Sequence, residues 1–242
     1  MVYENATVED IRREKLHEGG GEVRAKYSHE NERYVLGMVV MASCQLCGIN
    51  GIFYYAKQLL GEVTGGDVRL AQELMLGLAF CQGASSLICS RFVDLFGRKF
   101  LLMKGQQILI GILLAIFVVD NLGDEMGIPG LSYLTVILIY AHVIIFNFSL
   151  GPVAVIYAAE LVPNMTPMIV SLRTATFMVA LSTNYIIHEF GIGQLFLLFG
   201  VLTAVAHTFL QRRLRETKGK SKPQIFQMFE LDYDPEEKTG FL

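Results

Sequence analysis

The chain has 242 residues, a formal net charge of −3, a hydrophobic fraction of 52% and a mean hydropathy of +0.44. A soluble domain has roughly 45–50% apolar residues, and here the excess is concentrated in long runs. This composition argues against a soluble enzyme and gives no reason to expect a nucleic-acid partner. It predicts a protein whose surroundings are a lipid bilayer.

The segment 1–33 is polar and charged. It lacks the apolar core of a cleavable signal peptide, so the first apolar run would itself direct insertion into the membrane. We expect residues 1–33 to form a charged cytoplasmic linker.

Long apolar runs fill the middle of the chain. A helix needs about 20 apolar residues to cross a bilayer. Six runs reach this length and predict a bundle over residues 34–211: 34–59, 69–93, 100–119, 132–158, 166–189 and 193–211. The expected fold class is an all-α, multi-pass integral membrane protein with six transmembrane helices and no enzyme active site.

The distribution of lysine and arginine predicts the orientation, because cytoplasmic loops carry an excess of both. Basic residues gather before the first run, in the turn 94–99 and after residue 211, whereas the loops 60–68 and 120–130 contain none. We therefore expect a cytoplasmic tail over 212–242 and both ends of the bundle in the cytosol. Beyond Pro223 the tail mixes aromatic and acidic residues, and we expect it to be disordered.

The first run carries polar side chains near its centre, including Gln45, Asn50 and Tyr54. Amides are costly in lipid, so they should face a wet cavity or a partner helix, and both alternatives remain open. Cys44 and Cys47 lie one helical turn apart with no histidine beside them. So short a motif predicts helix packing rather than a metal site, and we expect neither a metal nor a cofactor.

Two further motifs follow. In the turn Asp94-Leu95-Phe96-Gly97-Arg98-Lys99, the glycine permits a tight turn while Asp94 and Arg98 can pair across helix ends. In the fourth run, Gly151-Pro152 precedes Glu160. Proline removes a backbone hydrogen bond, which membrane helices tolerate where the freed carbonyls face a cavity or another helix.

These motifs, in this order and spacing, resemble the C-terminal half of a sugar porter of the major facilitator superfamily, from about Tyr34 to Lys222. Residues 44–55 resemble the family motif QQxxGINxxxYY, with Cys44 in place of its first glutamine. The turn 94–99 resembles DxxGR[RK], and residues 151–163 resemble the tenth transmembrane helix. Residues 215–219 resemble PETKG, with Arg215 in place of the proline.

The resemblance implies one half of a major facilitator fold, which would transport a hexose-like sugar by alternating access together with a second six-helix half. It implies sugar contacts from polar and aromatic side chains along the bundle: Gln45, Asn50, Tyr54, Gln82, Phe146 and Asn147. Gln82 could equally serve helix packing. It also implies a cytoplasmic gate formed by Asp94, Gly97, Arg98 and Glu160.

The chain also departs from the family pattern. Val155 stands where the family has a tryptophan, and Pro167 where it has an arginine. Arg173 lies about two turns inside the next run, where a charge costs roughly 2.5–3.5 kcal/mol, so we expect it to reach towards the cytosol or to pair with Glu160 or Asp94.

Three arrangements therefore stay open. The chain is a half-transporter that pairs with a second six-helix half or with itself, a truncated piece of a longer porter, or a degenerate porter domain. The last would be a structural subunit among other membrane subunits.

The orientation can be tested by cysteine accessibility. A cysteine placed at Gly130 should react with an impermeant reagent from outside the cell, and one placed at Lys220 should react only after permeabilisation. The reverse labelling pattern would contradict the orientation and the cytoplasmic position of the turn 94–99.

Overall fold

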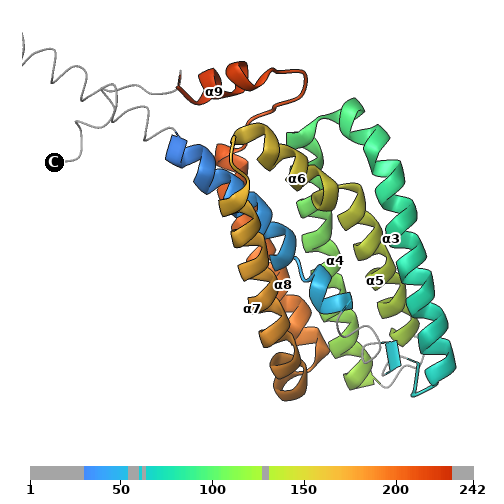
Figure 1. The fold of residues 1–242 in the computed structure, drawn as a ribbon. Coiled ribbons are helices and arrows are strands. Elements are labelled where there is room, and N and C mark those ends of the chain that lie inside the picture. The colour runs from blue at the N-terminus through green and yellow to red at the C-terminus, as the bar shows by residue number, and fades with distance from the viewer. Residues whose placement is uncertain (1–29, 54–59, 62–63, 127–130, 231–242) are drawn as a thin grey trace, which may run out of the picture.

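The computed structural model describes residues 30–53, 60–61, 64–126 and 131–230, and within these ranges the secondary structure is helical (Figure 1). A first helix covers residues 30–46 and a short one covers 49–53. The labelled helices are α3 (Val68–Phe96), α4 (Arg98–Met126), α5 (Leu131–Phe148), α6 (Leu150–Leu161), α7 (Thr166–Phe190), α8 (Ile192–Arg213) and α9 (Lys222–Glu230).

Most of these helices have the length and composition of membrane spans. Among the described residues, five stretches are long and apolar enough to cross a bilayer: Glu30–Phe53, Val68–Phe96, Arg98–Gly123, Tyr133–Leu161 and Ile192–Arg213. With 25 residues, α7 is long enough as well, at about 37 Å, but it carries polar side chains such as Arg173 and Asn184. It corresponds to the predicted run 166–189.

The helices pack side by side into one bundle. In Figure 1, α3 and α7 lie at opposite edges, and the first helix lies between α7 and the α5–α6 pair. The most extensive packing joins α4 to α8 and to α5. Fully buried leucines of α4 and phenylalanines of α8 form the centre of this core: Leu109, Leu113, Phe196 and Phe199.

The first membrane stretch is interrupted between residues 46 and 49. Gly48 has a φ of +82°, a conformation that residues with a Cβ rarely adopt. A Cβ at this position would also overlap the ring of Phe199. The break is held by hydrogen bonds from Gly48 N to Gln45 O (3.0 Å) and from Ile52 N to Gly48 O (3.0 Å).

A second break lies at Ser149, between α5 and α6. The sequence predicted one apolar run over 132–158 with a loosened helix at Gly151-Pro152. The structure instead places the break two residues earlier, at Ser149. Because the helix restarts at Leu150, Pro152 falls in the first turn of α6, where a missing N–H costs no intrahelical bond. The backbone of Gly105 in α4 approaches the break so closely that a Cβ there would overlap the Ser149 side chain.

The expectation of disorder beyond Pro223 was wrong for residues 224–230. They belong to α9, which lies across one end of the bundle and contacts α6. Ile225 and Phe229 are four residues apart and therefore share one helix face, and both are buried. The Arg33 guanidinium lies 3.9 Å from the Phe226 ring centroid, so α9 also covers the start of the first helix. Residues 231–242 lie outside the described residues.

Replacement of Gly48 tests the first break. Gly48→Ala should lower the free energy of unfolding by about 2–6 kcal/mol, because the backbone is strained and the methyl group overlaps Phe199. Thermal unfolding in detergent measures this. Gly83→Ala is the control, since Gly83 is a helical glycine with no atom within 4 Å of the added Cβ. Equal effects of the two substitutions would contradict the assignment of the break.

Candidate functional site

The two helix breaks lie beside each other. Cys44 Sγ is 3.6 Å from the carbonyl oxygen of Leu150, the first residue of α6. Cys44 precedes the predicted site residue Gln45, and Leu150 follows shortly after the predicted site residue Asn147. The fold therefore brings the polar centre of the first membrane stretch next to the break in the α5–α6 pair.

Gln45 and Asn50 form a pair across the first break. Asn50 Nδ2 donates a hydrogen bond to Gln45 Oε1. Gln45 is 9% exposed, and Asn50 is half-buried. Among the described residues, neither Gln45 Nε2 nor Asn50 Oδ1 has a further partner. The pair thus keeps one donor and one acceptor for another molecule.

Phe146 and Asn147 lie at the second break and are both buried. The Phe146 ring covers Gly151, where a Cβ would lie 3.1 Å from it. Asn147 Nδ2 donates to Val143 O of its own helix at 2.8 Å, so its amide nitrogen is already used. Only the carbonyl side of Asn147 remains available for a ligand.

The other predicted contacts are less closely connected. Gln82 is half-buried on α3, and among the described residues no hydrogen bond joins it to Gln45, Asn50 or Asn147. Tyr54 lies outside the described residues. Val155, where the family tryptophan is missing, is 47% exposed on α6. Pro167 is in the first turn of α7, a position that suits proline.

The predicted gate residues Asp94, Gly97 and Arg98 lie at the turn between α3 and α4, and Glu160 lies on α6. Gly97 has a φ of +86° and allows the tight turn. Arg98 Nη2 is 3.1 Å from Glu160 Oε1 on α6, with both side chains largely buried at 16% and 23% exposure. Arg98 Nη1 is 3.8 Å from Asp94 Oδ1, and the Asp94 side chain is 80% exposed. The partner of Arg98 that matters is therefore Glu160, since long, exposed ion pairs contribute little.

Glu216 makes contacts at this turn that the sequence interpretation missed. Its Oε1 accepts hydrogen bonds from the backbone N of Arg98 (2.9 Å) and Lys218 (3.0 Å), and its Oε2 accepts from Lys99 N (3.0 Å). The first amides of a helix need an outside acceptor and favour a negative charge, and Gly97 has no side chain to supply either. The sequence signal for such an outside acceptor was a helix that begins directly after a glycine.

Two more hydrogen bonds fix the segment around Glu216. Lys218 Nζ donates to Leu95 O at 2.9 Å, one of the unpaired carbonyls at the end of α3. Arg215 N donates to the hydroxyl of Tyr157 on α6 at 3.2 Å. The gate cluster, defined here as Arg98, Glu160 and Glu216, therefore joins α4, α6 and the segment after α8.

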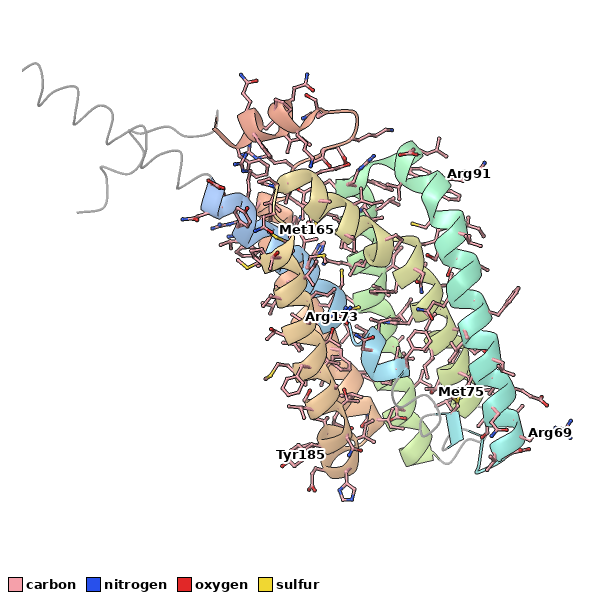
Figure 2. All side chains as sticks on the ribbon, in the orientation of Figure 1. Arg69, Met75, Arg91, Met165, Arg173 and Tyr185 are labelled. Atoms are coloured by element: carbon pink, nitrogen blue, oxygen red, sulfur yellow. The ribbon has the colours of Figure 1, made fainter. Side chains whose placement is uncertain are left out.

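Two groups near this end, one carboxylate oxygen of Glu160 and the guanidinium of Arg173, lack a partner among the described residues. Glu160 Oε2 is buried and has no hydrogen-bond partner there. Arg173 is exposed in the half of α7 nearer Met165 (Figure 2) and makes no ion pair with any described residue. The expectation left two alternatives for Arg173, and the pairing with Glu160 or Asp94 is not found, because both carboxylates face Arg98 instead. The alternative, that Arg173 reaches towards the cytosol, stays a prediction.

The sequence matches a known family and known transporters. A family model described as "Sugar (and other) transporter" matches residues 5–229. The glucose facilitated diffusion protein of Zymomonas mobilis is 30% identical over 206 residues, covering 80% of this chain and 42% of the relative. Human solute carrier family 2, facilitated glucose transporter member 4, is 27% identical over 201 residues, covering 81% and 38%. The chain spans about two fifths of the length of these relatives.

The fold matches solved transporters over the same share. The structure of XylE from E. coli, a major facilitator proton:xylose symporter bound to 6-bromo-6-deoxy-D-glucose, has a TM-score of 0.67 at 20% identity. The match covers 81% of this chain and 42% of that chain. A double tryptophan mutant of XylE gives the same TM-score at 23% identity. The chain thus has the fold of one half of a major facilitator, and it belongs to the sugar (and other) transporter family of multi-pass integral membrane proteins.

Proposed function

We propose that this chain forms the C-terminal bundle of a sugar transporter and carries a hexose-like sugar across a membrane together with a second six-helix bundle. The observation that carries the proposal is the Gln45–Asn50 pair, which lies across a helix break beside a second break. Transporter substrates bind near the middle of the bilayer at discontinuous helices, where a non-helical backbone can line a cavity.

The chemistry of the pair suits a sugar. Gln45 Nε2 is a donor and Asn50 Oδ1 is an acceptor, while a sugar hydroxyl both donates and accepts. One hydroxyl can therefore bond to both residues, and the existing bond between the two amides holds them in position. In this proposal the carbonyl of Asn147 and the residues Gln82, Phe146 and Tyr54 complete the wall that faces the sugar.

The Glu160 oxygen and the Arg173 guanidinium that lack partners support a second bundle. A buried carboxylate oxygen without a partner costs several times more than a typical hydrogen bond contributes. Glu160 Oε2 and the Arg173 guanidinium are suited to polar groups on a bundle facing this one. The relatives are more than twice as long as the matched region. Their remaining residues are enough for a second bundle of similar size.

We also propose that the gate cluster holds the cytoplasmic end of the bundle in one conformation. Arg98 and the start of α4 are fixed to α6 by Glu160 and to the segment after α8 by Glu216. Movement of α4 against α6 would break the ion pair and the hydrogen bonds together. Asp94 and Gly97 shape the turn on which this cluster depends.

A second candidate function rests on Val155. Its exposed position on α6 offers no aromatic ring for a sugar to stack against. A structural subunit that no longer transports would not need such a ring, and its polar wall would be covered by other membrane subunits.

The amide pair gives the direct test of transport. Gln45→Ala and Asn50→Ala should each weaken hexose binding several-fold, because a lost hydrogen bond is worth about 0.5–1.5 kcal/mol. The double variant should bind hexose only slightly more weakly than either single variant, since each single substitution already breaks the hydrogen bond between the two amides. Binding of labelled hexose to the assembly extracted in mild detergent, and uptake in liposomes, measure this.

The control is Gln211→Ala, which removes an exposed amide near the end of α8. Native mass measurement of the same extract identifies what accompanies the chain. Hexose uptake by an assembly with a second six-helix bundle supports transport. A fixed ratio with unrelated membrane subunits and no uptake would replace transport by the structural role.

The gate cluster predicts a separate result. Glu216→Gln should lower Tm by roughly 3–12 °C, because its amide removes the charge and sets an N–H group against a backbone N–H. The comparison is Asp94→Asn, which removes an exposed carboxylate and should lower Tm by about 1–2 °C. Thermal unfolding of purified protein distinguishes them. The opposite ranking would show that Asp94, rather than Glu216, holds the turn.

A further inference from the structure

A polar network lies inside the bundle and shares no residue with the amide pair or the gate cluster. It contains Gln106 of α4 (0% exposed), His207 of α8 (9% exposed) and Ser43 of the first helix (1% exposed). The surrounding core is apolar, and polar side chains at such positions in a membrane protein are costly unless they find partners. These three residues come from three different helices.

The hydrogen bonds on one side of the imidazole fix its donors. His207 Nδ1 is 3.2 Å from Gln106 Oε1, which can only accept, so Nδ1 carries the proton. Gln106 Nε2 donates to Ser43 Oγ at 3.2 Å. The Ser43 hydroxyl then donates to Val40 O at 2.7 Å. Each group therefore accepts from the previous one and donates to the next.

The other side of the imidazole continues the same direction. Lys104 Nζ donates to Gln107 Oε1 at 3.1 Å, which orients the amide of Gln107. Its Nε2 then points at His207 Nε2, 3.4 Å away, and a donor there requires an unprotonated ring nitrogen. A second proton on His207 would set two N–H groups against each other.

We propose that Lys104, Gln107, His207, Gln106 and Ser43 form one directed hydrogen-bond chain, which keeps His207 neutral with its proton on Nδ1 and holds the first helix against α4 and α8. Gln106, His207 and Ser43 are buried whereas Lys104 and Gln107 are exposed, and the hydrogen bonds run in one direction through all five side chains. Reversal of the Gln106 amide would leave its buried donor facing the donor Nδ1 of His207, and a half-satisfied polar network is unfavourable in a core.

The position of this hydrogen-bond chain in the bundle gives it a role. Ser43 lies two residues before Gln45 and five before the break at Gly48. The hydrogen-bond chain therefore anchors the last turns of the first helix. Ser171 Oγ also bonds to Met38 O, at 3.0 Å, one turn earlier. Residues 49–53, beyond the break, are not part of it. Lys104, Gln107, Gln106 and His207 are thus positioning residues for the helix that carries Gln45. This inference does not depend on sugar as the substrate.

The protonation state of His207 can be observed directly. The full chain, labelled with ¹⁵N-histidine and held in detergent micelles, gives ring-nitrogen chemical shifts that distinguish protonated from unprotonated nitrogen. The His207 signals are assigned by their loss in His207→Asn. We expect a protonated Nδ1 and an unprotonated Nε2. A proton on Nε2, with or without one on Nδ1, would overturn the proposal.

Matched variants test the anchoring. In His207→Asn the side-chain amide can take the place of Nδ1–H and still donate to Gln106, whereas in His207→Gln it lies nearer the place of Nε2. Hydrogen exchange of amides 41–46 should stay near that of the wild type in the first variant. In the second it should rise roughly five- to a hundred-fold, the factor that corresponds to one unsatisfied buried group.

Ser43→Ala should raise the same exchange, because it leaves Gln106 Nε2 without its acceptor. The control is Thr203→Ala, since the buried Thr203 hydroxyl bonds only to Phe199 O of its own helix, at 2.7 Å. Equal exchange in the Ser43 and Thr203 variants, or in the two His207 variants, would show that the chain does not hold the first helix.

Discussion

A backbone group that leaves its helix inside a bilayer must find another partner, because no water is available there to bond with it. This constraint explains why each irregular point of the bundle is accompanied by a specific contact. At Gly48 the backbone N–H donates to Gln45 O, and the carbonyl accepts from Ile52 N. At Ser149 both the backbone N–H and the side-chain hydroxyl donate to carbonyl oxygens of α5. The breaks are therefore defined structures, and polar residues can be placed beside them.

At the turn between α3 and α4, the free backbone amides at the start of α4 are satisfied by a charge. A glycine makes the turn possible but cannot cap the helix that follows it, so the capping group comes from Glu216, more than a hundred residues later in the sequence. A carboxylate that receives several backbone N–H groups is held more strongly than the exposed, 3.8 Å contact between Asp94 and Arg98. The stability of the turn 94–99 therefore depends on Glu216, which lies outside the turn motif.

The sequence predicted the family and the fold class correctly, because long apolar runs and ordered motifs are local features. It could not predict contacts between distant residues. Glu216 was recognised within a motif but given no role, and the network around His207 was missed because a lone histidine or glutamine in an apolar run does not reveal its partner. Of the two alternatives for Arg173, the ion pair is not found among the described residues, and its reach towards the cytosol stays a prediction. The sugar contacts stay predictions, since geometry alone does not identify a ligand.

The expectation for the tail failed for a different reason. Acidic and aromatic residues mixed over a short segment were interpreted as disordered, but the spacing of Ile225 and Phe229 gives one buried face that only the rest of the bundle can cover. Propensity within nine residues was too weak to predict such a helix, since short helices are stable mainly through tertiary packing.

The position of α9 has a consequence for biosynthesis. Arg33, at the start of the first membrane stretch, is covered by Phe226, which is synthesised roughly 190 residues later. At about 5–20 residues per second, the ribosome needs roughly 10–40 s to cover that distance. During this interval the buried guanidinium has no ring beside it and the first stretch must stay in the membrane without that contact. The packing of α9 against Arg33 therefore follows synthesis of the other described helices of the bundle.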